Sequence, residues 1–144
     1  MSSTAPFSVT MDALDPAAQA NFWSLALGYV LEPPPTPYAT WAETLAAWGL
    51  PEERWNDASA LNDPAGVSPR LFIQKVPEPK QGKNRVHLDV RVSVDRFNKD
   101  KAALLAKADQ LVAAGATLVR VFDEESMGYW IVMNDPEGNE FCIV

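Results

Sequence analysis

Two stretches decide the fold: Asn62-Asp63-Pro64-Ala65-Gly66 and, later in the chain, Asn134-Asp135-Pro136-Glu137-Gly138. Each lies between two apolar runs, where Asp-Pro-x-Gly is a turn signal. Proline presets φ, aspartate hydrogen-bonds the nearby backbone, and glycine takes the position that needs a positive φ. The copies start at residues 62 and 134, so they lie 72 residues apart, half of the 144-residue chain. The repeat predicts one supersecondary unit used twice.

The first half opens with a strand and a helix. Apolar and polar residues alternate over residues 7–13, which predicts a half-buried strand. Asp15 and Pro16 then supply an N-cap and a first-turn proline for a helix over about residues 16–27, which ends at Gly28. The expected core contacts of this helix are Phe22, Trp23, Ala26 and Leu27.

The second half opens in the same way. Residues 86–92 alternate strictly, with His87, Asp89 and Arg91 on the polar face. A helix is expected over about residues 98–113, with an apolar stripe of Leu104, Leu105, Leu111 and Val112 and a stop at Gly115. The other strands are expected at residues 58–61, 71–76, 117–122, 129–133 and 141–144.

Each half therefore reads β-α-β-β-β, which predicts an α+β fold of two tandem modules in one domain, residues 1–144. Module one covers residues 6–76 and carries an insert at about residues 31–57 with a proline run and a short helical segment, residues 38–48. A linker rich in proline and glycine, residues 77–84, joins it to module two, residues 85–144.

Composition excludes several classes of protein. Apolar content of 47% and charged content of 22% are typical of a soluble globular protein, and no apolar run is long enough to span a membrane. Residues 1–6 do not resemble a secretion signal and Cys142 is the only cysteine, so we expect a cytoplasmic protein without a disulfide. The net charge of −7 and the lack of a basic cluster argue against nucleic acid, and the acidic balance favours a cationic ligand.

The modules and several local strings resemble the vicinal oxygen chelate superfamily, which includes glyoxalase I, extradiol dioxygenases and bleomycin-resistance proteins. The chain is most similar to a glyoxalase-like subgroup common in actinobacteria. The strings are Leu14-Asp15-Pro16, Asn21-Phe22-Trp23, Leu27-Gly28-Tyr29, Gln74-Lys75-Val76-Pro77-Glu78-Pro79-Lys80, Asn84-Arg85-Val86-His87-Leu88-Asp89 and Asn134 through Cys142. The resemblance implies a mixed sheet curled around a cavity, as in dihydroxybiphenyl dioxygenase, and a homodimer.

In the metal-dependent members, ligands project from the first and last strand of each module, as His or Gln and then Glu. The resemblance carries these positions onto Ser8 and Gln74 in module one and onto His87 and Cys142 in module two, with Glu140 as a substitute on the same face as Cys142. A catalytic Zn, Ni, Fe or Mn site needs several imidazole and carboxylate ligands. Only His87 and Glu140 suit such a divalent metal, so no metal cofactor is expected.

The polar face of module two has two interpretations. His87 is either a general base or ligand anchor in the cavity, or a structural histidine bonded to Asp89. Asp89 and Arg91 are expected to form a structural ion pair, with an anion anchor as the alternative. In this fold the polar face would line the cavity.

Cys142 is expected to be a buried and inert thiol. Gln74, which interrupts an apolar run, is expected to be buried, where it either braces the sheet or contacts a ligand. The tryptophan-rich insert, with Trp41 and Trp48, is either a cap over the sheet or a lid for an apolar or aromatic ligand.

Three functions remain open. The preferred one is a metal-independent protein that binds a small aromatic or cationic molecule, as a sequestering or antibiotic-resistance-type protein or as an enzyme without a metal. Its cavity would be closed by Trp41 and Trp48 and lined by Ser8, Gln74, His87, Asp89, Arg91 and Cys142. The second is a metal-dependent lyase, isomerase or dioxygenase with His87 and Glu140 as ligands. The third is a structural or interaction module without a ligand.

Overall fold

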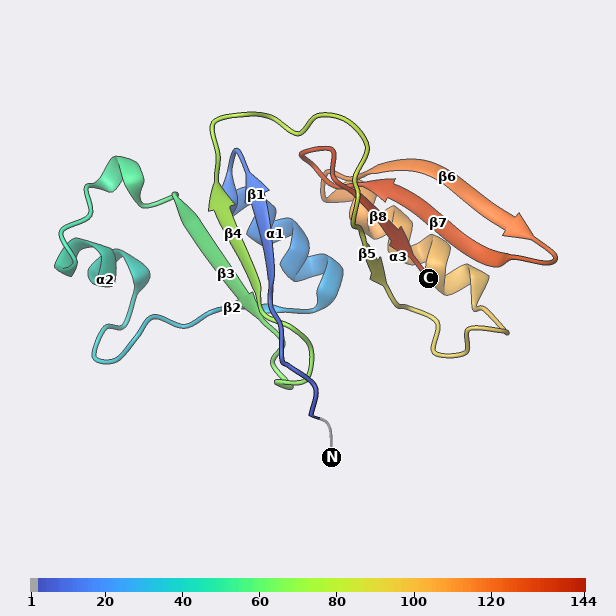
Figure 1. The fold of residues 1–144 in the computed structure, drawn as a ribbon, viewed down its shortest axis with the longest axis horizontal. Helices are drawn as coiled ribbons and strands as arrows, with labels where there is room; N and C mark the ends of the chain where they lie inside the picture. The colour runs from blue at the N-terminus through green and yellow to red at the C-terminus, as the bar shows by residue number, and fades with distance from the viewer. Residues whose placement is uncertain (1–2) are drawn as a thin grey trace. The chain divides into compact units, whose positions relative to one another are not determined.

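The structure, a computed structural model, describes residues 3–144, so residues 1 and 2 of the N-terminal segment, residues 1–6, lie outside the described residues. The chain divides into two compact units, one that ends at Pro79 and one that runs from Lys80 to Val144 (Figure 1). The boundary falls inside the segment predicted as a linker, residues 77–84. Each unit is described below by itself.

Unit 1 is a four-stranded mixed sheet with one helix packed against it. Its elements are β1 (Val9–Ala13), α1 (Pro16–Leu27), β2 (Val30–Leu31), β3 (Ala58–Asn62) and β4 (Leu71–Lys75). The strand order is β1-β4-β3-β2, with β1 parallel to β4 and the other pairs antiparallel. The insert between β2 and β3 carries α2 (Trp41–Ala47) and a 3-10 turn, η1 (Glu52–Arg54).

Helix α1 forms as its sequence predicts. The Asp15 carboxylate accepts from the Ala18 backbone N–H at 3.2 Å, Pro16 opens the first turn, and Gly28 ends the helix at φ 72°. The positive φ is a conformation that glycine adopts at little cost. Of the four expected core residues, three are buried as predicted, Phe22, Trp23 and Ala26, whereas Leu27 is half-buried.

Unit 2 repeats the same arrangement. Its elements are β5 (Leu88–Val90), α3 (Lys101–Ala113), β6 (Thr117–Glu124), β7 (Gly128–Asn134) and β8 (Glu140–Ile143). The strand order is β5-β8-β7-β6, with β5 parallel to β8, and α3 packs against β6, β7 and β8. The predicted α+β fold of two tandem βαβββ modules is confirmed.

Of the four residues predicted for the apolar face of α3, two are buried and two are exposed. Leu104 and Leu111 are fully buried, but Leu105 and Val112 are 42% and 45% exposed, and Ala108 completes the buried stripe. Residues four and three apart share a helix face, whereas the next residue along the chain is rotated by about 100°. The helix also begins at Lys101 rather than near residue 98, because the Asp100 carboxylate caps the Ala103 N–H.

The first strand of unit 2 is shorter than the predicted residues 86–92. Pairing with β8 begins at Leu88 opposite Phe141, and Val86, expected on the core face, is 79% exposed. Before Leu88 the backbone of this segment no longer pairs with β8. At that point the first residue of β8, Glu140, donates its N–H to a side chain, Asn84 Oδ1, at 3.1 Å. His87 therefore lies just outside the strand rather than within it.

Across residues 3–144, no helix is long and apolar enough to cross a membrane.

Candidate functional site

One face of the sheet in unit 2 carries an open hollow of about 800 Å³. Strand β7 separates the two faces, because Tyr129, Ile131 and Met133 are buried while the alternate residues Trp130 and Val132 are half-buried. Successive side chains of a strand point to opposite faces, so Trp130 and Val132 lie on the face away from the core. Both of them line the hollow.

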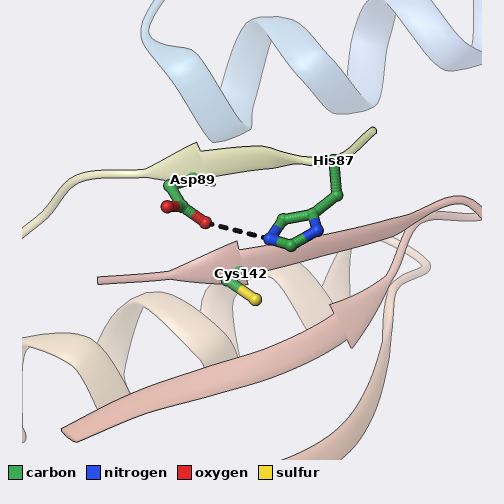
Figure 2. A group of neighbouring side chains, drawn as sticks. All are labelled: His87, Asp89 and Cys142. Atoms are coloured by element: carbon green, nitrogen blue, oxygen red, sulfur yellow. Dashed lines mark ion pairs between the residues drawn. The ribbon is translucent and has the colours of Figure 1, made fainter. Parts of the chain in front are cut away.

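Three groups with metal-ligating or acid–base chemistry meet in this hollow: His87, Asp89 and Cys142. Asp89 pairs with Cys142 in the register of the parallel strands β5 and β8, and His87 Nε2 lies 3.3 Å from Asp89 Oδ1 (Figure 2). One ligating atom of each residue lies within 4.8 Å of the other two. The polar face predicted for residues 87–91 therefore faces the hollow, with the Asp89 carboxylate beside the imidazole of His87.

The Cys142 thiol is held in its neutral form. Burial, the carboxylate of Asp89 and that of Glu140 together raise its pKa to about 11. The side chain is 6% exposed. The predicted burial of this thiol is therefore confirmed. Because the thiolate is the nucleophilic and metal-binding form of cysteine, a raised pKa favours the inert thiol of the prediction.

Glu140, the substitute ligand in the sequence prediction, also lines the hollow. Its carboxylate forms an ion pair with Lys83, and this cation, more than His87 or Lys80, lowers its pKa. A carboxylate paired in this way is ionised at neutral pH and already has a cationic partner.

Aromatic side chains form a second wall of the hollow. Phe122 and Trp130 are cross-strand neighbours of β6 and β7, and their rings stack with centroids 4.7 Å apart and planes 7° from parallel. The Arg120 guanidinium lies over the outer side of this pair, 4.1 Å from the Phe122 centroid. Phe122 is thus covered on both sides, and the free ring face of the stack is that of Trp130.

Three cations complete the lining: Arg91, Arg96 and Lys99. The expected ion pair between Asp89 and Arg91 is not among the ion pairs of the described residues, because the carboxylate of Asp89 is paired with His87 instead. Arg91 sits next to the C-terminal residue, since Val144 accepts from the Val92 N–H at 2.7 Å and donates to Val90 O at 2.9 Å. The position is therefore at the end of β5, away from His87.

The candidate residues of module one lie in unit 1. Ser8 is exposed and precedes β1 by one residue. Gln74, expected to be buried, is exposed, and its Nε2 donates to Asp12 Oδ1 at 2.8 Å. The expectation of burial was wrong because Gln74 lies on the sheet face opposite to the fully buried Ile73. Asp12, its partner, was not among the predicted site residues.

The two tryptophans of the insert contact each other in unit 1. Their rings meet edge to face with centroids 6.4 Å apart, and Trp41 Nε1 donates to the Glu32 carbonyl at 2.7 Å. Trp48 is 62% exposed. Helix α2 begins three residues after the predicted start at residue 38, because the side chains of Thr40 and Glu43 form a capping box there. That these tryptophans close a ligand cavity stays a prediction.

Sequence reasoning did not single out Arg96, Lys99, Phe122 or Trp130. The signal for Trp130 was available, since residues 129–133 alternate around three buried side chains. Phe122 lies on the same face because it pairs with Trp130. That pairing depends on the turn between β6 and β7, which the sequence did not specify. Arg96 and Lys99 lie in the irregular segment between β5 and α3, where no periodicity marks a face.

Two βαβββ modules, one of which carries a polar hollow on its sheet, define a protein of the vicinal oxygen chelate superfamily. The family model described as glyoxalase-like domain matches residues 8–144. The chain therefore belongs to the glyoxalase-like domain family. No curated protein matches it significantly.

Solved structures agree on the fold. A glyoxalase/bleomycin resistance protein/dioxygenase family enzyme from Burkholderia phytofirmans PsJN superposes with a TM-score of 0.65 at 19% identity, over 96% of this chain and 97% of that one. A fosfomycin resistance protein FosX variant from Listeria monocytogenes, complexed with Mn(II) and 1S,2S-dihydroxypropylphosphonic acid, gives a TM-score of 0.63 at 12% identity, over 99% and 90%.

A third solved structure, the bleomycin-binding protein of Streptomyces verticillus complexed with copper(II)-bleomycin, gives a TM-score of 0.52 at 15% identity, over 100% of this chain and 98% of that one. At these identities the likeness establishes the fold alone, and the chemistry of the site has to be argued from the side chains of this chain.

Proposed function

We propose that this protein binds a small organic molecule in the hollow of unit 2 and does so without a resident catalytic metal. The observation that carries the proposal is the composition of the hollow. A stacked aromatic wall and a set of polar groups that includes the His87–Asp89 pair surround about 800 Å³, the size range of small-molecule sites. Solved relatives that bind bleomycin or a phosphonic acid on the same fold support a ligand-binding role.

The donor chemistry supports the absence of a hard catalytic metal such as the Mn(II) of the FosX complex. Manganese prefers several carboxylate oxygens. In this hollow the Glu140 carboxylate is paired with Lys83, the Asp89 carboxylate is paired with His87, and the third nearby donor is a protonated thiol. The residues of the hollow therefore do not match the ligands that this class of metal requires.

An NMR screen tests ligand binding directly. Of the five tryptophans only Trp130 lies in unit 2, so its indole N–H signal in a proton–nitrogen spectrum reports on the hollow and the other four serve as internal references. We expect at least one compound from a library of aromatic acids, amines and neutral aromatics to shift the Trp130 signal and leave the others in place. If no compound of the library shifts the Trp130 signal, the result would favour a structural or interaction module.

Metal analysis tests the second part of the proposal. We expect protein purified without added metal to contain far less than one transition-metal ion per chain. A stoichiometric metal that is removed by EDTA and that also shifts the Cys142 and His87 signals on its return would overturn the metal-independent proposal.

One observation favours a second candidate, a metal-dependent lyase, isomerase or dioxygenase. His87, Asp89 and Cys142 offer three ligating atoms within 4.8 Å, and imidazole with thiolate is a donor set that zinc accepts. Binding would have to deprotonate a thiol whose pKa is about 11, so it would release a proton and strengthen with rising pH. Zinc titration at two pH values distinguishes this candidate from the first.

A further inference from the structure

We propose that the ligand of the hollow is a planar aromatic carboxylate, whose ring stacks on the free face of Trp130 and whose carboxylate is held by Arg91, Arg96 and Lys99. This inference rests on the proposed ligand-binding function and names the class of ligand. It differs from the cationic ligand that the acidic composition of the whole chain favours.

The charge of the hollow is opposite to that of the protein. The chain carries a net charge of −7, yet the side chains that line the hollow include three cations, Arg91, Arg96 and Lys99, and two carboxylates, Asp89 and Glu140. A local excess of cations inside an acidic protein attracts an anion to that one place, and low-dielectric walls strengthen the attraction.

Each of the two carboxylates of the lining lies beside a basic side chain. Asp89 is paired with His87 and Glu140 with Lys83. Within residues 3–144, Arg91, Arg96 and Lys99 form no ion pair, and the nearby Asp95 and Asp100 carboxylates accept backbone N–H groups of residues 97, 98 and 103. The three cations are therefore available to an anion from solution.

The sheet places the aromatic wall within reach of Arg91. On one side of Val144, backbone hydrogen bonds with Val90 and Val92 place it beside Arg91. On the other side, Ile143 pairs with Ile131 in the antiparallel register, so the next pair along is Val144 and Trp130. Phe122 pairs with Trp130, so Arg91, Val144, Trp130 and Phe122 follow one another across the sheet. Neighbouring strands are about 4.8 Å apart, so the backbones of Arg91 and Trp130 lie about 10 Å apart.

That separation suits one ring with a carboxylate attached to it. A ring that stacks on the face of Trp130 turned away from Phe122 would direct its carboxylate toward a guanidinium that extends from the position of Arg91. Arginine binds carboxylates through two parallel N–H···O bonds, which fixes the plane of the group as well as its position. Arg96 and Lys99, which come from the segment before α3, would close the same end.

Matched ligands test the charge. Three compounds share one ring system, the anion 2-naphthoate, the neutral 2-naphthamide and the cation 2-naphthylmethylammonium, and calorimetry and the Trp130 indole signal report binding of each. We expect 2-naphthoate to bind at least tenfold more tightly than either of the others, with an affinity that falls as salt rises from about 0.05 to about 0.5 M.

Matched variants test the residues. Loss of a charged hydrogen bond costs about 10-fold in affinity, so we expect Arg91→Gln, Arg96→Gln and Lys99→Gln each to weaken 2-naphthoate binding by about that factor and leave 2-naphthamide unchanged. Arg54→Gln is the control, because it removes an exposed cation of unit 1 that pairs with Asp57. Unchanged Trp130 chemical shifts in the unliganded variants show that the fold is intact.

The outcomes separate this inference from the proposed function. Binding of the amide or the ammonium with equal or greater affinity, or an Arg91→Gln variant with unchanged 2-naphthoate affinity, overturns the anionic class and leaves ligand binding in place. Failure of all three compounds, together with a library that never shifts Trp130, overturns both.

Discussion

The thiol of Cys142 should resist alkylation far more than an ordinary cysteine. The carboxylates of Asp89 and Glu140 and, above all, burial raise its pKa from 9.0 to about 11. At pH 8 this leaves about 100-fold less thiolate than an unperturbed thiol has, and thiolate is the form that reacts. We therefore expect iodoacetamide to modify the native protein at least about 100-fold more slowly than the protein unfolded in urea.

The assay is unambiguous because Cys142 is the only cysteine of the chain. Mass spectrometry follows one added carbamidomethyl group, and the rate measured from pH 7 to pH 11 gives the pKa of the thiol. Asp89→Asn removes the second cause of the shift, so it should lower this pKa without returning it to 9.0, because burial is the first cause. A native thiol that reacts at the unfolded rate, or titrates at or below pH 9, would refute the account of the site.

The same pKa predicts how stability depends on pH. The folded-state pKa lies above the unfolded one, so the unfolded chain loses its proton first as the pH rises. The contribution of the neutral thiol is complete below about pH 9 and is lost as the pH rises to about 11, which amounts to roughly 2–3 kcal/mol. The difference in unfolding free energy between the native protein and Cys142→Ala should therefore change over this window, and a difference that stays constant contradicts the assignment.

Three further predictions concern the fold. Leu104→Ala should lower the unfolding free energy in urea by about 2–5 kcal/mol, and Leu105→Ala by less than about 1 kcal/mol, because only Leu104 is fully buried. Asp135→Ala should destabilise the protein more than Asp63→Ala, because both carboxylates accept backbone N–H groups but only that of Asp135 is buried; equal losses of melting temperature would contradict this. The protein is also expected to be a homodimer, as its family resemblance implies and as the exposed outer strand β6 supports, and light scattering that gives a monomer at micromolar concentration would show otherwise.

The sequence predicted the elements of the fold more securely than their faces. The two Asp-Pro-x-Gly turns and the caps at Asp15 and Gly28 are local signals, and local hydrogen bonds realise them. The face of α3 was misjudged because Leu105 is as apolar as Leu104, and only packing against the sheet decides which of them is buried.

The candidate site was predictable where it follows strand periodicity. The polar alternation of residues 87–91 identified His87 and Asp89 correctly as members of one face, and the turn located Cys142 opposite them. Arg96 and Lys99 reach the hollow from an irregular segment, so their place depends on the tertiary path of the chain. The partner of Asp89 was misjudged because both His87 and Arg91 lie two residues away from it, and spacing alone does not choose between them.

The registers of the two sheets refine how the modules correspond. Asp12 lies opposite Gln74 in the parallel pair β1 and β4, as Asp89 lies opposite Cys142 in the pair β5 and β8. If the aspartates correspond, the counterpart of His87 in module one is Thr10, two residues beyond Ser8. Each module therefore has a carboxylate at the same place on its first strand, but Gln74 donates to it in module one and His87 pairs with it in module two. An amide has no proton to exchange near neutral pH, whereas an imidazole beside a carboxylate is the combination that general acid–base chemistry uses, so of these two pairs only the one in module two is suited to proton transfer.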